Sequence, residues 1–374
     1  MTSWAVLVLA AAACAGPDGR GQASPDEPAP TVEPAPPVVA ATVVAPPVVA
    51  AERWLKGSTH VHARPSGDSS TPIPDVVRWY AEHGYDFFVL TDHNKVSVVD
   101  EPRAGSPALE VPEAGPIVFA GVELTHNPDG CQPAGDPSGK CRIHVNLLGV
   151  TARPTGKLDW ADRSTRERLP KYEAALRQQQ QLGGVIQLNH PTWFGGMTVA
   201  LLTALAARGV PLVEIANVQF ARWNQGDADH PGTEQLWDGA LVQGATLWGV
   251  ASDDAHDYTR DAGAAYPAGG GWVMVWARRE PQAILDALVA GRFYASTGVV
   301  LARADVEDGA LVVEVAAGEG GAHTIEWIED GVRVARGAGP LARRAVPARG
   351  YLRAVVTRDD GARAWVQPRR RPAP

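Results

Sequence analysis

From residue 52 onward the chain alternates short apolar runs with segments of helical periodicity, and this alternation restricts the fold more than any other feature. Runs such as 85–90 and 246–251 predict strands. Segments 73–83 and 281–290 predict helices, each with a proline in its first turn and a glycine just beyond its end. Strands separated by helices form parallel βαβ units, so the sequence predicts an α/β sheet or barrel.

Histidines and carboxylates recur where the predicted strands end. In a barrel of parallel strands the carboxyl ends converge on one face, so these side chains are expected to meet there. His144 stands early in its predicted strand, which is therefore either antiparallel or preceded by a loop that supplies the ligand. The candidates are His60, His62, His93, Glu123, His144, His190, Asp254 and His256.

The spacing of these residues suits metal binding. Residues i and i+2 of a strand point the same way, so His60 and His62 can offer two imidazoles to one ion, and Asp254 and His256 repeat the arrangement. A carboxylate can bridge two cations, and Glu123 is the candidate for that role. Any one histidine alone is more simply a core or surface group, but the whole set is hard to explain by packing.

Six short motifs in residues 56–298 resemble those of the polymerase and histidinol phosphatase (PHP) family. The motifs are His-Val-His, Thr-Asp-His-Asn, Gly-Val-Glu, His-Val-Asn-Leu-Leu-Gly, Asn-His-Pro and Ser-Asp-Asp-Ala-His, in the family's order. The resemblance implies a distorted (β/α)7 TIM-like barrel in residues 52–298, with two or three divalent ions (Zn, Mn or Fe). It implies ligand roles for the eight candidates and for Asp68, and the nine together favour three ions. Of the pair Asp253 and Asp254, Asp254 keeps the Asp-x-His spacing.

Within that family, the closest resemblance is to the CehA/McbA-type branch. It is carried by Gly-Tyr-Asp-Phe-Phe, by Gly-Gly-Val-Ile-Gln-Leu-Asn-His-Pro with Val-Glu-Ile-Ala-Asn, and by Gly-Arg-Phe-Tyr-Ala-Ser-Thr-Gly. The family hydrolyses phosphate mono- or diesters, and the branch would add carbamates and aryl esters. The implied function is hydrolysis of a small-molecule ester by a hydroxide held between ions, with Glu123 and Asp254 as catalytic residues.

Two other functions are open alternatives. An exported binding protein could keep a metal site for structure and use its C-terminal region to bind carbohydrate or protein. An amidohydrolase would use a carboxylated lysine late on a strand, but no lysine occupies a predicted strand end.

Three polar residues flank the predicted ligands: Asp92, Asn94 and Asn189. They are expected to orient imidazoles through hydrogen bonds. The alternative is that they cap loop backbone.

The N-terminus predicts export. Residues 5–13 are apolar and too short to span a bilayer, and Ala-Ala-Ala-Cys suggests a lipoprotein signal over residues 1–14 with lipidation of Cys14. A plain export signal is the alternative. Residues 15–51, rich in Pro, Ala and Val, predict an extended tether. A periplasmic or outer-surface location follows, with membrane contact only through a lipid anchor.

The remaining features concern partners and the C-terminus. A net charge of −8 argues against specific nucleic-acid binding, and oligomeric state is not indicated. Cys131 and Cys141 flank a Pro/Gly-rich loop and would form a disulfide in an oxidising compartment, or else stay as free thiols. Residues 299–374 read as short strands with Asp-Gly turns and predict a small β-sandwich, which resembles an Ig-like tail.

Overall fold

The computed structural model describes residues 51–99, 105–259 and 265–371. The predicted signal with Cys14, and the tether apart from Ala51, lie outside the described residues. None of the described helices is long and apolar enough to span a membrane.

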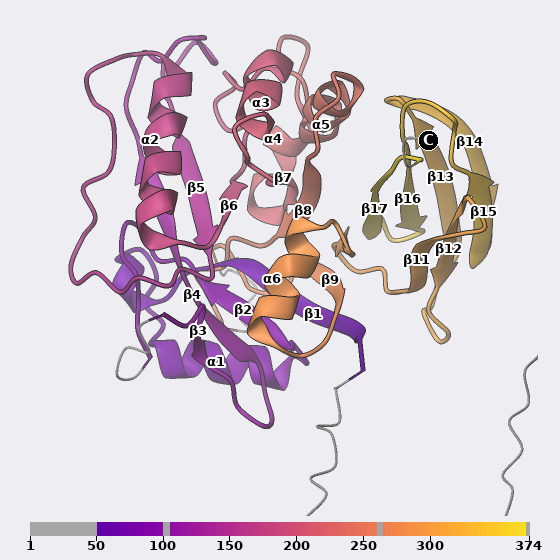
Figure 1. Ribbon diagram of the computed structural model, residues 1–374, viewed down its shortest axis with the longest axis horizontal. Helices are drawn as coiled ribbons and strands as arrows, with labels where there is room; N and C mark the ends of the chain where they lie inside the picture. The colour runs from indigo at the N-terminus through magenta and orange to yellow at the C-terminus, as the bar shows by residue number, and fades with distance from the viewer. Residues whose placement is uncertain (1–50, 100–104, 260–264, 372–374) are drawn as a thin grey trace, which may run out of the picture. The chain divides into compact units, whose positions relative to one another are not determined.

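The first part of the described chain is a mixed α/β structure, as expected, in which helices flank a large sheet (Figure 1). Its strands are β1 (Arg53–Val61), β2 (Phe87–Leu90), β3 (Ala108–Glu110), β4 (Ile117–His126), β5 (Ile143–Leu148), β6 (Val185–Leu188), β7 (Leu212–Asn217), β8 (Trp248–Ser252), β9 (Trp272–Ala277) and β10 (Phe293–Ser296). Its helices are α1 (Ile73–Glu82), α2 (Arg168–Leu182), α3 (Val199–Ala206), α4 (Ala221–Gln225), α5 (Thr233–Val242) and α6 (Pro281–Val289), with 3-10 turns at Arg64–Ser66 and Val218–Phe220.

Strand pairing differs from that of a regular parallel barrel. The order is β10-β9-β1-β2-β4-β5-β6-β7-β8, in which β5 and β9 run antiparallel to both neighbours. No ladder between described strands joins β8 to β1, and a single parallel bridge links Val61 to Ala255. Closure into a (β/α)7 barrel therefore stays a prediction, whereas the α/β class is confirmed.

The inner strands are buried on both faces of the sheet. Every residue of β2 and β5 is buried, which is the pattern of strands covered on both sides. Gly121 of β4 lets the strands approach closely, because a Cβ there would lie 2.8 Å from the carbonyl oxygens of Leu90 and Leu147. This approach brings Glu123, two residues further on, between the ends of the neighbouring strands.

The C-terminal strands are β11 (Leu301–Glu307), β12 (Ala310–Val315), β13 (His323–Glu329), β14 (Val332–Ala338), β15 (Leu341–Ala345), β16 (Leu352–Arg358) and β17 (Arg363–Arg369). They form two sheets that share a core including Leu311, Val313, Ile325 and Val356. One sheet is β11-β12-β15, and the other is β14-β13-β16-β17, which continues the large sheet because β17 pairs with β10. The predicted boundary at residue 298 therefore does not interrupt the hydrogen bonding of the large sheet.

Candidate metal centre

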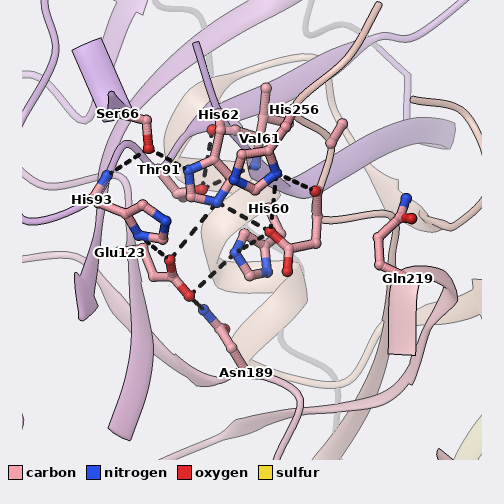
Figure 2. A network of polar contacts seen from close by, with 12 residues as sticks. His60, Val61, His62, Ser66, Thr91, His93, Glu123, Asn189, Gln219 and His256 are labelled. Atoms are coloured by element: carbon pink, nitrogen blue, oxygen red, sulfur yellow. Dashed lines mark hydrogen bonds and ion pairs between the residues drawn. The ribbon is translucent and has the colours of Figure 1, made fainter. Parts of the chain in front are cut away.

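The predicted ligands come together at one end of the inner strands (Figure 2). His60 and His62 lie at the end of β1, and His93 follows β2. His144 is the second residue of β5, yet it meets the others because β5 is antiparallel and pairs His144 with Thr125 near the end of β4. The first of the two interpretations of His144 is therefore confirmed.

Glu123 lies at the centre of the cluster and is 1% exposed. Its Oε1 lies 3.0 Å from Nδ1 of His144, 3.4 Å from Nε2 of His60 and 3.6 Å from Nε2 of His190. Its Oε2 lies 2.5 Å from Nδ1 of His93 and 3.8 Å from Nε2 of His62. One carboxylate thus faces five imidazoles with both oxygens, as a residue bridging two cations must.

Asp254 supplies the second buried carboxylate. Its Oδ1 lies 3.1 Å from Nε2 of both His60 and His62, and its Oδ2 lies 3.9 Å from Nε2 of His190. Asp253 turns away instead, and its carboxylate accepts hydrogen bonds from the Gly269 N–H and the Ser58 hydroxyl. Of the two adjacent aspartates, Asp254 is the one that faces the cluster.

Asp68 marks the outer edge of the cluster. Its Oδ2 lies 2.9 Å from Nε2 of His93 and 3.3 Å from Nε2 of His256, while half of its side chain is exposed to solvent. Eight of the nine predicted ligands, all except Asp254, fall into three overlapping groups in which the ligand atoms of each lie within 4.8 Å of one another. The groups are His62, Asp68, His93 and His256; His60, His62 and Glu123; and Glu123, His144 and His190.

Hydrogen bonds at the far nitrogen orient two of the imidazoles. His60 Nδ1 lies 2.7 Å from Oε1 of Glu214, and His62 Nδ1 lies 2.9 Å from the hydroxyl of Ser66. The Nε2 atoms of both rings are buried and make no hydrogen bond of good geometry among the described residues, although Oδ1 of Asp254 lies 3.1 Å from each. Two such imidazole nitrogens facing one carboxylate oxygen match a cation site, because metal-bound histidines donate their other N–H to a fixed acceptor.

The electrostatics of the cluster also favour a cation. Burial and the neighbouring His256 and His93 lower the pKa of His62 to about 3, so its ring stays neutral and can donate a lone pair. Burial opposes charge on His60, but Asp254, Glu214 and Glu123 hold its pKa well above the usual value. The buried carboxylates of Asp254, Glu214 and Glu123 are stabilised by positive charge nearby, which divalent ions would supply.

Two of the predicted ligands have unusual backbone conformations. His190 has φ of 26° and Asp254 has φ of 48°, values that non-glycine residues adopt rarely. Such strain gathers at functional sites, where the surrounding structure enforces it.

The three flanking residues behave differently from one another. The Asp92 carboxylate accepts a hydrogen bond from the Ala63 N–H. The Asn94 amide accepts a hydrogen bond from the Thr125 N–H and donates one to the Thr125 carbonyl. These two side chains therefore bond backbone, as the alternative stated, and neither hydrogen-bonds an imidazole among the described residues. Asn189 donates to Oε1 of Glu123 at 2.9 Å, so it positions the central carboxylate and no imidazole.

A small cavity of about 150 Å³ opens beside the cluster. Predicted ligands line it together with Trp193, Phe220 and Tyr266, whose rings lie beside those of His144, His190 and His256. A disulfide joins Cys131 to Cys141 in the loop before β5, the strand that carries His144.

Comparison with known proteins found distant likenesses among solved structures. No protein-family model matches the chain, and no curated protein matches it. One similar solved structure is a two-domain protein from Bacteroides vulgatus, described as containing a predicted PHP-like metal-dependent phosphoesterase. It is 17% identical, covers 84% of this chain and 95% of its own, and has a TM-score of 0.45.

Glu214 is the main residue that sequence reasoning missed. It lies in β7, is 0% exposed, and accepts hydrogen bonds from the Ser252 hydroxyl at 2.5 Å and the His190 N–H at 2.6 Å, besides contacting His60. Its signal in the sequence was a lone acid inside the apolar run Leu-Val-Glu-Ile-Ala. Because a buried acid needs partners, that run could have indicated a polar site.

Glu214→Gln is expected to weaken metal binding about 10–100-fold, because the acceptor that fixes the His60 ring loses its negative charge. Titration against a chromogenic chelator would measure the change in affinity. Glu82→Gln, an exposed position on α1, is the matched control. Equal affinities in the Glu214 and Glu82 variants would contradict the orienting role.

Proposed function

We propose that the protein is a metal-dependent hydrolase of ester bonds and that phosphoesters are its main substrates. The observation that carries this proposal is the arrangement of nine predicted ligands around Glu123, beside a cavity. Two or three divalent ions, of zinc, manganese or iron, fit this mixture of imidazoles and carboxylates. The resemblance of the motifs to the PHP family, and to its CehA/McbA-type branch, is part of the same proposal.

When bound, the ions would lower the pKa of a coordinated water and polarise the ester. The chain's own residues would hold these ions in place. Glu123 and Asp254 present buried oxygens to several imidazoles at once, and Glu214 and Ser66 keep the Nε2 atoms of His60 and His62 turned inward.

The remaining side chains around the cavity control access. Trp193, Phe220 and Tyr266 reduce the water that can reach the cavity, which strengthens electrostatic interactions inside it. Asp68 is the ligand most open to solvent, and so a substrate would approach on its side of the cluster.

A binding protein with a structural metal site is the alternative. A structural zinc site needs four ligands in a closed shell. Here six histidines surround two carboxylates, Glu123 and Asp254, and the cluster opens to a cavity, which favours catalysis.

Turnover by metal-loaded protein tests the proposal. Protein stripped with a chelator and then reloaded with Zn²⁺, Mn²⁺ or Fe²⁺ would be assayed with 4-nitrophenyl phosphate, bis(4-nitrophenyl) phosphate, 4-nitrophenyl acetate and an aryl N-methylcarbamate. Turnover is expected in the reloaded protein alone, and fastest with a phosphoester. Failure of every reloaded form with every ester would refute hydrolysis, and a preference for the carbamate would refute the substrate assignment.

Export to the periplasm or outer surface is also proposed, from the apolar run of residues 5–13 and the cysteine that follows it. The Cys131–Cys141 disulfide is of the kind that persists in such oxidising compartments. Fractionation of cells expressing the full chain would test this location.

A further inference from the structure

A row of aromatic side chains leads away from the metal centre along the turn after β6 and onto α4. The ring centroids are 5.1 Å apart for His190 and Trp193, 5.2 Å for Trp193 and Phe194, and 5.3 Å for Phe194 and Trp223. All three of Trp193, Phe194 and Trp223 are partly exposed. We call these three residues the aromatic wall.

Three cations lie against the aromatic wall. The Arg142 guanidinium is 5.2 Å from the Trp193 ring and 4.9 Å from the Phe194 ring. Lys140 Nζ is 5.2 Å from the Phe194 ring, and the Arg222 guanidinium is 5.4 Å from the Trp223 ring. A guanidinium stacked on a ring is held in one orientation while its N–H groups stay available to an anion.

These cations lack carboxylate partners. No ion pair within 4.0 Å joins Lys140, Arg142 or Arg222 to an acidic residue in the described part of the chain. Asp129 attracts Arg142 but forms no ion pair with it. Asp227, which lines the same hollow as Arg222, bonds His230. No ion pair of the described residues therefore neutralises the three cations at the wall.

The loop that carries two of the cations is firmly held. The Cys131–Cys141 disulfide closes it next to Arg142. The Asp136 N–H donates to the Phe194 carbonyl at 2.8 Å, and Arg168 Nε donates to the Pro133 carbonyl at 2.8 Å. Cations that are already positioned lose little conformational entropy when a ligand binds.

A second hollow lies beside the wall. It measures about 60 Å³ and is lined by Thr192, Arg222, Trp223 and His230 among others. The Thr192 side chain is 4% exposed, and its hydroxyl has no hydrogen-bond partner among the described residues. A buried hydroxyl without a partner is costly unless a ligand or water bonds it.

We propose that the aromatic wall and its three cations form a subsite for the part of an ester substrate that carries an aromatic ring followed by a second anionic group. This inference rests on the proposed hydrolase function, since the scissile ester would lie at the metal centre. The ring would lie against the wall, and the outer anion would meet Arg142, Lys140 and Arg222. The subsite thus selects substrates with two separated negative charges.

Binding of three phosphodiesters tests the subsite directly. Dimethyl phosphate has neither ring nor outer charge, diphenyl phosphate adds the rings, and bis(4-carboxyphenyl) phosphate adds the outer charges. Calorimetry on the full-length, metal-loaded protein is expected to show the Kd falling about tenfold at each step. Ring stacking and a charge-assisted hydrogen bond are each worth roughly this factor.

Variants assign each step to its residues. Trp223→Ala is expected to remove most of the gain between the dimethyl and diphenyl ligands. Arg142→Gln is expected to remove most of the gain from the carboxylates, and Arg142→Lys to keep part of it. Arg336→Gln, an exposed arginine of β14, removes the same charge elsewhere and is expected to change nothing.

The outcomes separate this inference from the proposed function. Equal affinity for the three ligands, or equal losses in Arg142→Gln and Arg336→Gln, would overturn the subsite even if the protein hydrolyses esters. Stepwise binding in a protein that hydrolyses no ester would support the subsite and refute the hydrolase.

Discussion

Glu123→Gln is expected to lower ester turnover at least about a thousandfold while the fold is retained. The substitution keeps the shape of the side chain but removes the charge that faces His60, His93 and His144. Metal ions contribute several kcal/mol of transition-state stabilisation, and each 1.36 kcal/mol is a factor of ten in rate. Steady-state kinetics of the metal-loaded variant would measure the loss.

A control separates this effect from damage to the fold. Glu113→Gln makes the same chemical change at an exposed position and is expected to leave turnover unchanged. Circular dichroism would establish that both variants are folded. If the Glu123 variant kept a tenth or more of wild-type turnover, the central role of this carboxylate would be wrong.

Arg353→Ala is expected to cost about 2–3 kcal/mol of unfolding free energy, because it removes a buried guanidinium and leaves two half-buried carboxylates without their partner. Arg353 is 1% exposed and donates to both oxygens of Asp238, at 2.7 and 2.6 Å, and to Glu234 at 3.0 Å. Its guanidinium also lies 4.9 Å from the Trp237 ring. These contacts join β16 to α5, and urea denaturation would measure their loss.

The comparison is again with Arg336→Gln, whose side chain is 69% exposed. Surface substitutions of this kind usually change stability by about 0.5 kcal/mol or less. A similar small change for Arg353→Ala would show that the buried network contributes little to stability.

The inner strands and the clustering of the predicted ligands were predictable because their signals are local. Apolar runs define strands, and polar ligand residues at their ends stand out against them. The antiparallel course of β5 was left open, since strand direction depends on pairing with β4 and β6. His144 shows the consequence, because its position early in the strand makes sense once that direction is known.

Other features depend on contacts that spacing does not encode. Asp92 and Asn94 adjoin His93 in the sequence but bond the backbone of Ala63 and Thr125. Glu214 is far from His60 in sequence and yet fixes its ring. The continuation of the sheet from β10 into β17 joins segments that composition alone assigns to separate domains.

The most direct test of the metal centre is the metal content of the purified protein, measured by elemental analysis after incubation with Zn²⁺, Mn²⁺ or Fe²⁺ and removal of unbound ions. The arrangement of ligands around Glu123 and Asp254 predicts two to three tightly bound ions per chain, and at most one in a His60→Ala, Glu123→Gln double variant. A wild-type protein that retains less than one ion per chain with each of these metals would contradict the account.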